Sequence, residues 1–286
     1  YKDKKPYLST AKIKEVLRES RKLGAIHLNL TGGEPLLRDF DEICEIIRSF
    51  SPRNNLISIV TNALLLTFEK LNLLKKEGLD TLQLSLESLD AKEHDDMVGV
   101  NGSFDKVMQA IDYAASLGLN ICINIVVDRT SIKRVKDMAN LAKEKGAFVV
   151  LDTVSSVGRL KDKKELRLDG EYEEAFEGLL KDSYIRHDSS INFSLKRECP
   201  GGKERIHISA YGDVFTCPLV QVSYGNVNSE PLKLIYKRLS QYPHIKKEFR
   251  LCKHAFDKGY YRTIAGPAER TLKPPIHIDD ILKIKQ

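Results

Sequence analysis

The chain has 286 residues and a mass of 32.4 kDa, with 42% hydrophobic and 30% charged residues, so it is neither disordered nor collagen-like. No apolar run approaches the ~20 residues that a membrane-spanning helix requires, and no signal-peptide pattern is present, so we expect a cytoplasmic protein without membrane binding. Lys and Arg (46) exceed Asp and Glu (40) only slightly and without one dominant basic run, which argues against nucleic-acid binding.

Helical and strand patterns alternate in the first half of the chain. A helix is expected between the cap Ser9 or Thr10 and the stop Gly24, and further glycines each follow a helix and precede a strand. This punctuation is typical of βα units on a parallel sheet. The strands are expected at 25–30, 56–61, 81–86, 121–127 and 148–154, and the further helices at 40–50, 67–76, 103–117 and 131–145.

Five such strands fit either an open doubly wound sheet or a barrel. The dinucleotide signature G-x-G-x-x-G follows none of them, so we predict an α/β fold with a complete or partial barrel. In both folds a ligand binds at the carboxyl ends of the strands. Polar residues gather at those ends, at 31–35, 61–63, 85–88, 124 and 153–155.

The pattern changes after Arg159. One more helix is expected at 171–180, and a second module follows with a β-hairpin, whose strands lie at 205–209 and 214–217, and a helix at 232–240. The tail from Gly259 onward is expected to be irregular until a short helix at 278–284.

The five cysteines are an odd number in a long chain, which argues against a secreted disulfide scaffold. Cys44 and Cys122 lie in apolar stretches and are most simply buried thiols. Cys199, Cys217 and Cys252 fall together in the second module, where they are buried thiols, ligands of an iron–sulfur cluster, or ligands of a zinc ion with His254 as the fourth.

The segment Thr31-Gly32-Gly33-Glu34-Pro35 follows the first predicted strand. Two glycines allow a sharp turn and a close approach of the backbone to a ligand, and the Glu34 carboxylate would suit an ammonium group. A tight turn with a solvated glutamate is the alternative, and the position at a strand end favours binding.

Three stretches, LNLTGGEPLLRDF, VTNALLL and LQLSLESLDAKEHDDMVGVNGSFDKV, resemble in sequence and order the core of the radical S-adenosylmethionine (radical SAM) enzymes. The resemblance covers residues 8–160 and implies a partial (β/α)6 barrel that binds S-adenosylmethionine and a four-iron four-sulfur (4Fe–4S) cluster. It implies an ammonium site at Gly32, Gly33 and Glu34, and ribose or carboxylate contacts at Ser85, Glu87 and Asn124. It places Val154 near the adenine and adds Pro35, Thr61 and Asn62 to the cofactor-binding residues.

The family's cluster loop C-x-x-x-C-x-x-C occurs nowhere in this sequence. We expect it, with the first barrel strand, upstream of Tyr1; the alternative is a degenerate member of the family that has lost its chemistry.

The second module resembles the SPASM and twitch extensions of the same family. The segments that carry this likeness are CPGG from Cys199, GDVFTCP around Cys217, GNV from Gly225, and Cys252. By this resemblance Cys199, Cys217 and Cys252 hold one auxiliary 4Fe–4S cluster. The predicted division is a barrel at 1–185, a twitch-like module at 186–258 and a tail at 259–286.

The predicted function is reductive cleavage of S-adenosylmethionine and hydrogen abstraction from a ribosomally made peptide, which is thereby crosslinked, epimerised or oxidised. The alternatives are a small-molecule radical SAM dehydrogenase or other biosynthetic enzyme, and a non-catalytic barrel relic that acts as a binding protein. A flavodoxin-like or ferredoxin-like donor would supply electrons, attracted by the basic residues around Cys252, although a solvated basic face is the simpler interpretation of them. These basic residues are Lys246, Lys247, Arg250, Lys253, Lys258 and Arg262.

Tyr260 and Tyr261 either line the substrate cavity or pack the tail, and His94 is interpreted as a polar helix-start residue.

Overall fold

The computed structural model describes residues 7–154, 163–188, 199–249, 251–271 and 274–283, which form two compact units. The sheet unit comprises residues 10–152 and 176–186. The cysteine unit comprises the described parts of 1–9, 153–175 and 187–286 and contains Cys199, Cys217 and Cys252. Of the positions singled out in the sequence, Ser155, Arg159 and Arg250 lie outside the described residues.

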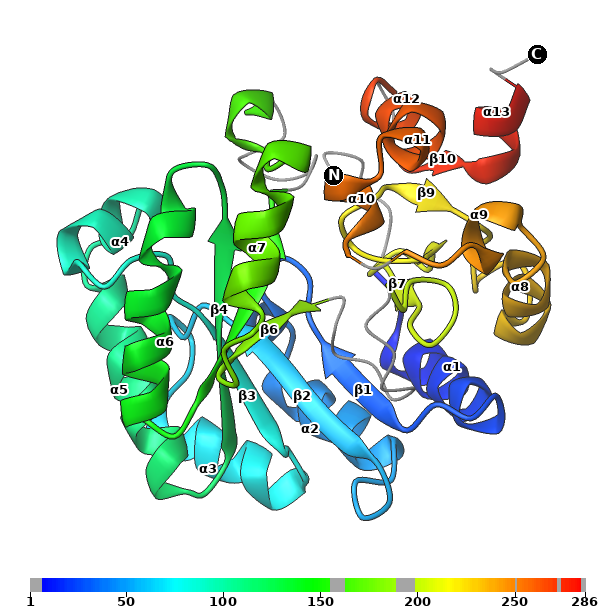
Figure 1. Ribbon diagram of the computed structural model, residues 1–286. Coiled ribbons are helices and arrows are strands. Elements are labelled where there is room, and N and C mark those ends of the chain that lie inside the picture. The colour runs from blue at the N-terminus through cyan, green and yellow to red at the C-terminus, as the bar shows by residue number, and fades with distance from the viewer. Residues whose placement is uncertain (1–6, 155–162, 189–198, 250, 272–273, 284–286) are drawn as a thin grey trace. The chain divides into compact units, whose positions relative to one another are not determined.

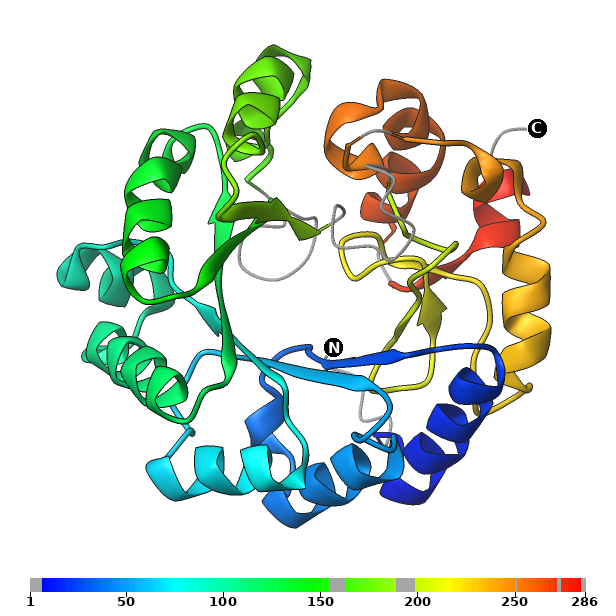
Figure 2. The same cartoon turned by 60° about the horizontal axis from the view of Figure 1, so that its bottom comes forward.

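The sheet unit is built on six parallel strands that curl into a half-barrel, with helices on its outer face (Figures 1 and 2). The strands lie side by side in chain order, so the sheet has no point at which the strand order reverses, as a doubly wound sheet would have. The predicted partial (β/α)6 barrel is confirmed. Its strands are β1 (His27–Leu30), β2 (Leu56–Thr61), β3 (Thr81–Ser85), β4 (Asn120–Val127), β5 (Phe148–Thr153) and β6 (Ile185–His187).

The two faces of the sheet differ in polarity. In β3 and β4, apolar side chains such as Leu82 and Leu84 are fully buried, and the residues between them are less buried. Successive strand residues point to opposite faces, and the register pairs Gln83 with Cys122 and Ser85 with Asn124. Polar side chains therefore line the inner face, and apolar ones pack against the helices.

The helices of the sheet unit begin and end at the signals that the sequence contains. Asp39 caps α2 by accepting hydrogen bonds from two backbone N–H groups, and Thr67 caps α3. Gly78 ends α3 with φ +110°, where a Cβ atom would also lie 2.3 Å from Pro52. None of the helices in the described parts of the chain has the length and apolar character of a membrane span. The helices are α1 (Thr10–Lys22), α2 (Phe40–Ser49), α3 (Phe68–Glu77), α4 (Ala91–Val98), α5 (Ser103–Ser116), α6 (Val135–Glu144) and α7 (Glu173–Leu179), which spans both units.

The cysteine unit contains the predicted hairpin. Strands β7 (His207–Ile208) and β8 (Val214–Phe215) are antiparallel, and Gly212 adopts φ +92° in the turn between them. Leu8 donates a backbone hydrogen bond to the Ala210 carbonyl oxygen in this turn region, and the Tyr7 ring stacks on that of Tyr211.

The tail is more ordered than the sequence predicts. Strand β10 (Ile276–His277) pairs in parallel with β9 (Val222–Ser223), and a π-helical turn, Tyr261–Ala265, occupies the segment expected to be irregular. The irregular prediction was wrong because each helix here has only three to six residues, too few for periodicity to reveal. The helices that follow β9 in the cysteine unit are α8 (Leu232–Leu239), α9 (Pro243–Lys246), α10 (Lys253–Phe256), α11 (Lys258–Tyr260), α12 (Gly266–Glu269) and α13 (Ile278–Lys283).

Candidate functional site

The turn after β1 is open. Gly32 has φ +129°, and in the described part of the chain no atom outside the adjoining residues lies within 4 Å of the position that a Cβ would occupy at Gly32 or Gly33. Pro35 begins a short 3₁₀ helix, Pro35–Leu37, which Glu34 caps by accepting a 3.0 Å hydrogen bond from the Leu36 N–H. The exposed backbone of both glycines therefore leaves room for a ligand beside Glu34.

The Glu34 carboxylate joins the ends of β1 and β2. Its Oε1 accepts a hydrogen bond from the Thr61 hydroxyl at 2.9 Å, in addition to that from Leu36, and its Oε2 accepts one from the Asn62 N–H at 3.0 Å. A carboxylate has about four acceptor positions, so one on Oε2 is left for a ligand donor such as an ammonium group. The structure thus brings together three predicted residues, Glu34, Thr61 and Asn62.

Asn124 presents an unsatisfied acceptor on the inner face. Its Nδ2 reaches Gln83 Oε1 at 3.5 Å, whereas its buried Oδ1 accepts no hydrogen bond from any described residue, and Ser85 is its partner in the register. A buried carbonyl oxygen without a donor costs ~1–3 kcal/mol. A ligand hydroxyl or N–H would remove that cost, so the ends of β3 and β4 fit the polar parts of a nucleoside.

Glu87, two residues beyond β3, is mostly buried. Burial raises its pKa to about 7, and the nearby Asp128 charge also raises it, whereas a 3.2 Å hydrogen bond from the Val126 N–H acts in the opposite direction. The Glu87 N–H donates to His94 Nδ1, and His94 Nε2 contacts Ser103 Oγ at 3.2 Å. His94 therefore lies buried in α4 and accepts a hydrogen bond from the Glu87 backbone. The polar residues around His94 in the sequence do not indicate that contact.

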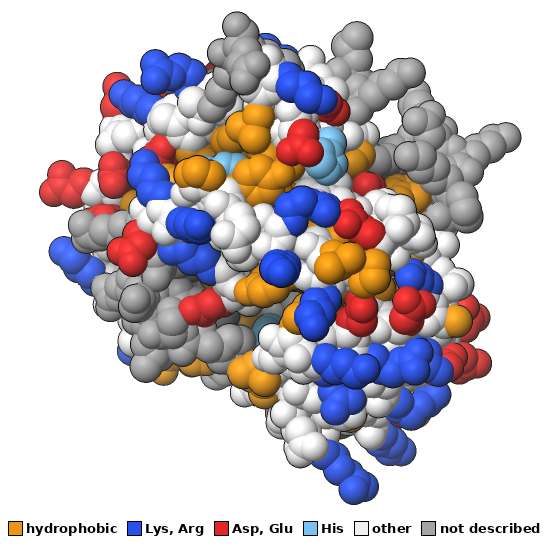
Figure 3. Space-filling view, turned by 90° about the vertical axis from the view of Figure 1, so that its right-hand side faces the viewer, with side chains coloured by type: hydrophobic (Ala, Val, Ile, Leu, Met, Phe, Trp, Pro, Cys, Tyr) orange, Lys and Arg blue, Asp and Glu red, His pale blue; other side chains and the backbone are white. Residues whose placement is uncertain are grey.

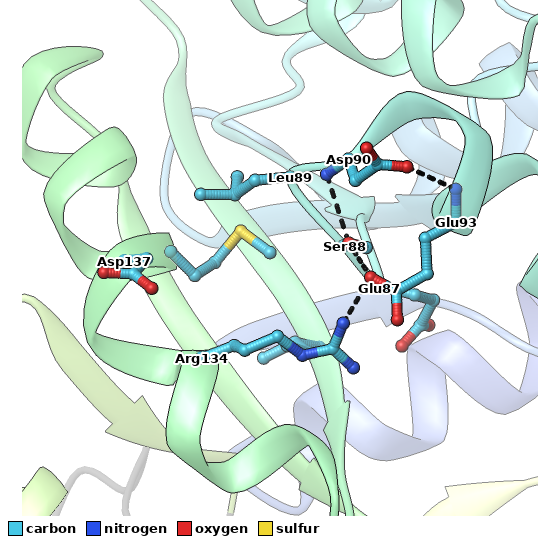
Figure 4. Close-up of a pocket in the computed structure, with 9 residues that line it drawn as sticks. Glu87, Ser88, Leu89, Asp90, Glu93, Arg134 and Asp137 are labelled. Carbon is cyan, nitrogen blue, oxygen red and sulfur yellow. Dashed lines mark hydrogen bonds and ion pairs between the residues drawn. The ribbon is translucent and has the colours of Figure 1, made fainter.

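A small cavity of about 180 Å³ lies beside Glu87, at the ends of β3 and β4 (Figure 4). Figure 4 shows the Arg134 guanidinium turned toward the Glu93 carboxylate, with which it forms an ion pair; Glu93 also accepts a 2.5 Å hydrogen bond from Ser88. Ligand pockets usually have volumes of about 300–1,000 Å³. This cavity is therefore smaller than an ordinary ligand pocket. Of the predicted cofactor-binding residues, Glu87 lines it.

Val154, the predicted adenine contact, directly follows β5. It is buried and belongs to the cysteine unit, whereas the other predicted cofactor residues belong to the sheet unit. Its role stays a prediction.

The three cysteines of the second module lie close enough for the charge of one to influence the pKa of another. All are free thiols, and burial raises the pKa of Cys217 to about 11 and that of Cys252 to about 12. Cys199 contributes to both increases, and Cys217 contributes to that of Cys252. We call these three residues the cysteine triad.

The backbone fits closely around the triad. A Cβ at Gly201 would lie 3.6 Å from Cys199 Sγ, and Thr153 Oγ1 lies 3.8 Å from Cys252 Sγ. Within the described ranges, no three His, Cys, Asp or Glu side chains are grouped as ligands of a single metal ion. The thiolate ligands of a four-iron cluster each bind a different iron, whereas the ligands of a zinc site all bind one ion.

His254, the candidate fourth zinc ligand, is held by the tail. Its side chain is 2% exposed, and its Nε2 lies 3.2 Å from Glu269 Oε1. Glu269 also accepts hydrogen bonds from Arg167 at 2.9 Å and Tyr261 at 2.7 Å. Tyr260 is buried, so it packs the interior, as one of the two interpretations of the sequence expected.

The basic residues around Cys252 differ in exposure. Lys246, Lys247, Lys258 and Arg262 are exposed, whereas Lys253 is 4% exposed and so does not belong to a solvated face. On the face of the molecule in Figure 3, Lys and Arg side chains are interspersed with Asp and Glu side chains. Lys253 therefore departs from both interpretations of these residues, a surface that attracts a donor and a solvated basic face.

Known proteins share both the sequence pattern and the fold. The PqqA peptide cyclase of Rhizobium meliloti is 26% identical over 251 residues, covering 81% of this chain and 66% of the cyclase. The AdoMet-dependent heme synthase of Methanosarcina barkeri is 26% identical over 263 residues, covering 80% of this chain and 73% of the synthase. This chain therefore spans just under two thirds of the length of the cyclase.

The crystal structure of Streptococcus suis SuiB bound to the precursor peptide SuiA has the same fold, with a TM-score of 0.59 and 19% sequence identity. The match covers 86% of this chain and 60% of SuiB. Residues 1–152, slightly more than half of the chain, match the model of the Radical SAM superfamily. With the curled parallel sheet and the turn at Glu34, this match establishes that the chain belongs to the Radical SAM superfamily.

Proposed function

We propose that the protein is a radical SAM enzyme that modifies a ribosomally made peptide. The observation that carries the proposal is the pair of unfilled positions at the carboxyl ends of the strands, the free acceptor position of Glu34 and the buried Oδ1 of Asn124. S-adenosylmethionine, when bound and reduced through a 4Fe–4S cluster, supplies a 5'-deoxyadenosyl radical that abstracts hydrogen from the substrate. The ligand cysteines of that cluster are not in this sequence.

The chain's own residues bind and orient the cofactor. The Gly32 and Gly33 backbone and the Glu34 carboxylate hold its ammonium group, while Thr61 and Asn62 keep that carboxylate in place. Asn124 Oδ1 accepts a hydrogen bond from the ribose. In this proposal Ser85 and Glu87 complete the ribose or carboxylate contacts, Pro35 fixes the turn, and Val154 contacts the adenine.

The cysteine triad holds an auxiliary 4Fe–4S cluster in a twitch-like module. Three converging free thiols support this assignment, since thiolates are the usual ligands of such clusters. We retain 1–185, 186–258 and 259–286 as the proposed division into barrel, module and tail. Electrons come from a flavodoxin-like or ferredoxin-like donor in the cytoplasm, attracted to the exposed Lys246 and Lys247.

The substrate class rests on the relatives. The PqqA peptide cyclase and SuiB, whose structure contains a precursor peptide, favour a peptide. The heme synthase supports the second candidate, an enzyme acting on a small molecule. Mass spectrometry of a candidate precursor peptide, incubated in deuterium oxide with the enzyme and S-adenosylmethionine, distinguishes them. A change in peptide mass supports the first, because crosslinking and oxidation remove hydrogen and epimerisation introduces solvent deuterium. A peptide whose mass matches that of a control without enzyme contradicts it.

Asn124→Ala tests the cofactor site itself. We expect this variant to weaken S-adenosylmethionine binding at least tenfold in anaerobic calorimetric titration of the reconstituted protein, because it removes the acceptor proposed for the ribose. Asn120→Ala is the matched control, since Asn120 lies on the same strand at its exposed amino-terminal end. Equal affinities in the two variants would exclude Asn124 from the site.

A further inference from the structure

Lys253 is a buried ammonium group next to the cysteine triad. Its residue is 4% exposed, and its Nζ donates a 3.4 Å hydrogen bond to the Gly201 carbonyl oxygen. The same Nζ lies 4.9 Å from the centre of the Tyr260 ring and 5.5 Å from that of the Phe249 ring. These contacts hold the charge in place but do not neutralise it.

No carboxylate among the described residues forms an ion pair with Lys253. The desolvation of an ammonium group costs several kcal/mol unless an anion compensates it, so buried lysines are nearly always paired. The observed partners are one neutral carbonyl and two aromatic faces. The described residues around Lys253 therefore do not supply the negative charge that this cation requires.

The triad thiols adjoin Lys253 in sequence and through Gly201, and they can supply negative charge. Lys253 directly follows Cys252, and its carbonyl partner Gly201 lies against Cys199. Thiols become thiolates when they bind iron, so cluster assembly would place negative charge next to this ammonium group.

We infer that Lys253 is the buried counter-ion of the auxiliary iron–sulfur cluster and raises its reduction potential. The inference rests on the proposed function, which assigns that cluster to the triad. The reduced cluster carries one more negative charge than the oxidised cluster, so a fixed cation nearby stabilises the reduced form more. Lys253 acts on the cluster through its charge and is a positioning residue, not a catalytic one.

Redox titration followed by electron paramagnetic resonance tests the inference. The 286-residue chain is reconstituted with iron and sulfide without oxygen, and the midpoint potential of its cluster is measured in the wild type and in Lys253→Met, which keeps the length of the side chain. We expect the equilibrium constant for reduction to fall at least tenfold, which is a shift of about 59 mV to lower potential.

Two control variants separate charge from shape and position. Lys253→Arg keeps the positive charge and should keep the wild-type potential. Lys247→Met removes an exposed lysine whose Nζ also lies over Phe249, at 4.7 Å, and is paired with Asp257 at 3.1 Å; it should leave the potential unchanged. If Lys253→Arg binds iron on reconstitution and Lys253→Met does not, that result also supports Lys253 as the counter-ion of the cluster.

Three results would overturn the inference. They are an unchanged potential in Lys253→Met, an equal shift in Lys247→Met, and loss of the cluster from both Lys253 variants while Lys247→Met retains it. Failure of the underlying cluster assignment has a different signature. The wild-type chain would then bind zinc or no metal, or a Cys199, Cys217 and Cys252 triple alanine variant would keep its iron.

Discussion

Replacement of Glu34 by glutamine tests the turn after β1, because the two side chains have nearly the same shape. The carboxylate accepts hydrogen bonds from Leu36, Thr61 and Asn62, at 2.9 to 3.0 Å. An amide has only one oxygen, so in either orientation its NH2 group would face at least one of these donors. We therefore expect Glu34→Gln to lose one or more of the three hydrogen bonds.

The loss can be estimated from the type of bond. Hydrogen bonds to a charged group contribute ~1.5–3 kcal/mol each, and the free energy of unfolding should fall by about that amount even without cofactor. If the remaining position on Oε2 binds the cofactor's ammonium group, the affinity for S-adenosylmethionine should also fall, by roughly 10- to 100-fold for the same loss of energy.

Urea denaturation and anaerobic calorimetric titration measure the two effects separately. Glu45→Gln is the control, since Glu45 is an exposed glutamate paired with Lys14, and it should change neither quantity. Wild-type stability in Glu34→Gln would refute the hydrogen-bond network. Reduced stability with unchanged affinity would instead refute the ammonium site and leave Glu34 with a structural role.

Three further predictions concern stability. Glu87→Gln should raise the free energy of unfolding at pH 8 by on the order of 2–3 kcal/mol but should leave it unchanged at pH 4. Burial raises the pKa of Glu87 from 4.5 to about 7, so at pH 8 the folded wild type must hold an ionised, buried carboxylate that the glutamine variant lacks. Equal effects at both pH values would contradict the shift. In that variant, stability should fall as the pH decreases from 6.5 to 4, since burial lowers the pKa of both His187 and His207 to about 4 and the unfolded chain binds their protons first; urea titrations showing no fall would contradict both shifts. Gly212→Ala should destabilise the protein by ~1–3 kcal/mol in thermal or urea unfolding, because φ is +92° and the new Cβ would lie 2.7 Å from Asn226 Oδ1, and wild-type stability would contradict this conformation.

The strands of the half-barrel were predictable because their apolar residues are flanked by clear turn and helix signals. β2 was predicted with the observed bounds, and β3, β4 and β5 to within one residue at either end. Helix α4 was not predicted as an element, although Asp90 caps it and Gly99 ends it in the left-handed conformation, signals that the sequence contains. Strand β6 has three residues, too few to show a period.

The candidate site was predictable in its residue types but not in its contacts. A glutamate after two glycines at a strand end indicated a binding turn, but the sequence did not indicate that Thr61 and Asn62 would occupy most of its carboxylate. Lys253 lies among other basic residues and was therefore expected at the surface. Lys253 lies over the rings of Phe249 and Tyr260 and donates to the Gly201 carbonyl oxygen, 52 residues away, a contact that local patterns do not encode.

The release of 5'-deoxyadenosine tests the central claim most directly. Protein produced from the complete coding sequence is reconstituted with iron and sulfide without oxygen, reduced with dithionite and incubated with S-adenosylmethionine, and the products are quantified by liquid chromatography. We predict that 5'-deoxyadenosine and methionine form in equal amounts, and that Asn124→Ala forms less of both at limiting cofactor concentration. Protein that contains reducible 4Fe–4S clusters but releases no 5'-deoxyadenosine would contradict the proposed function and favour the binding relic.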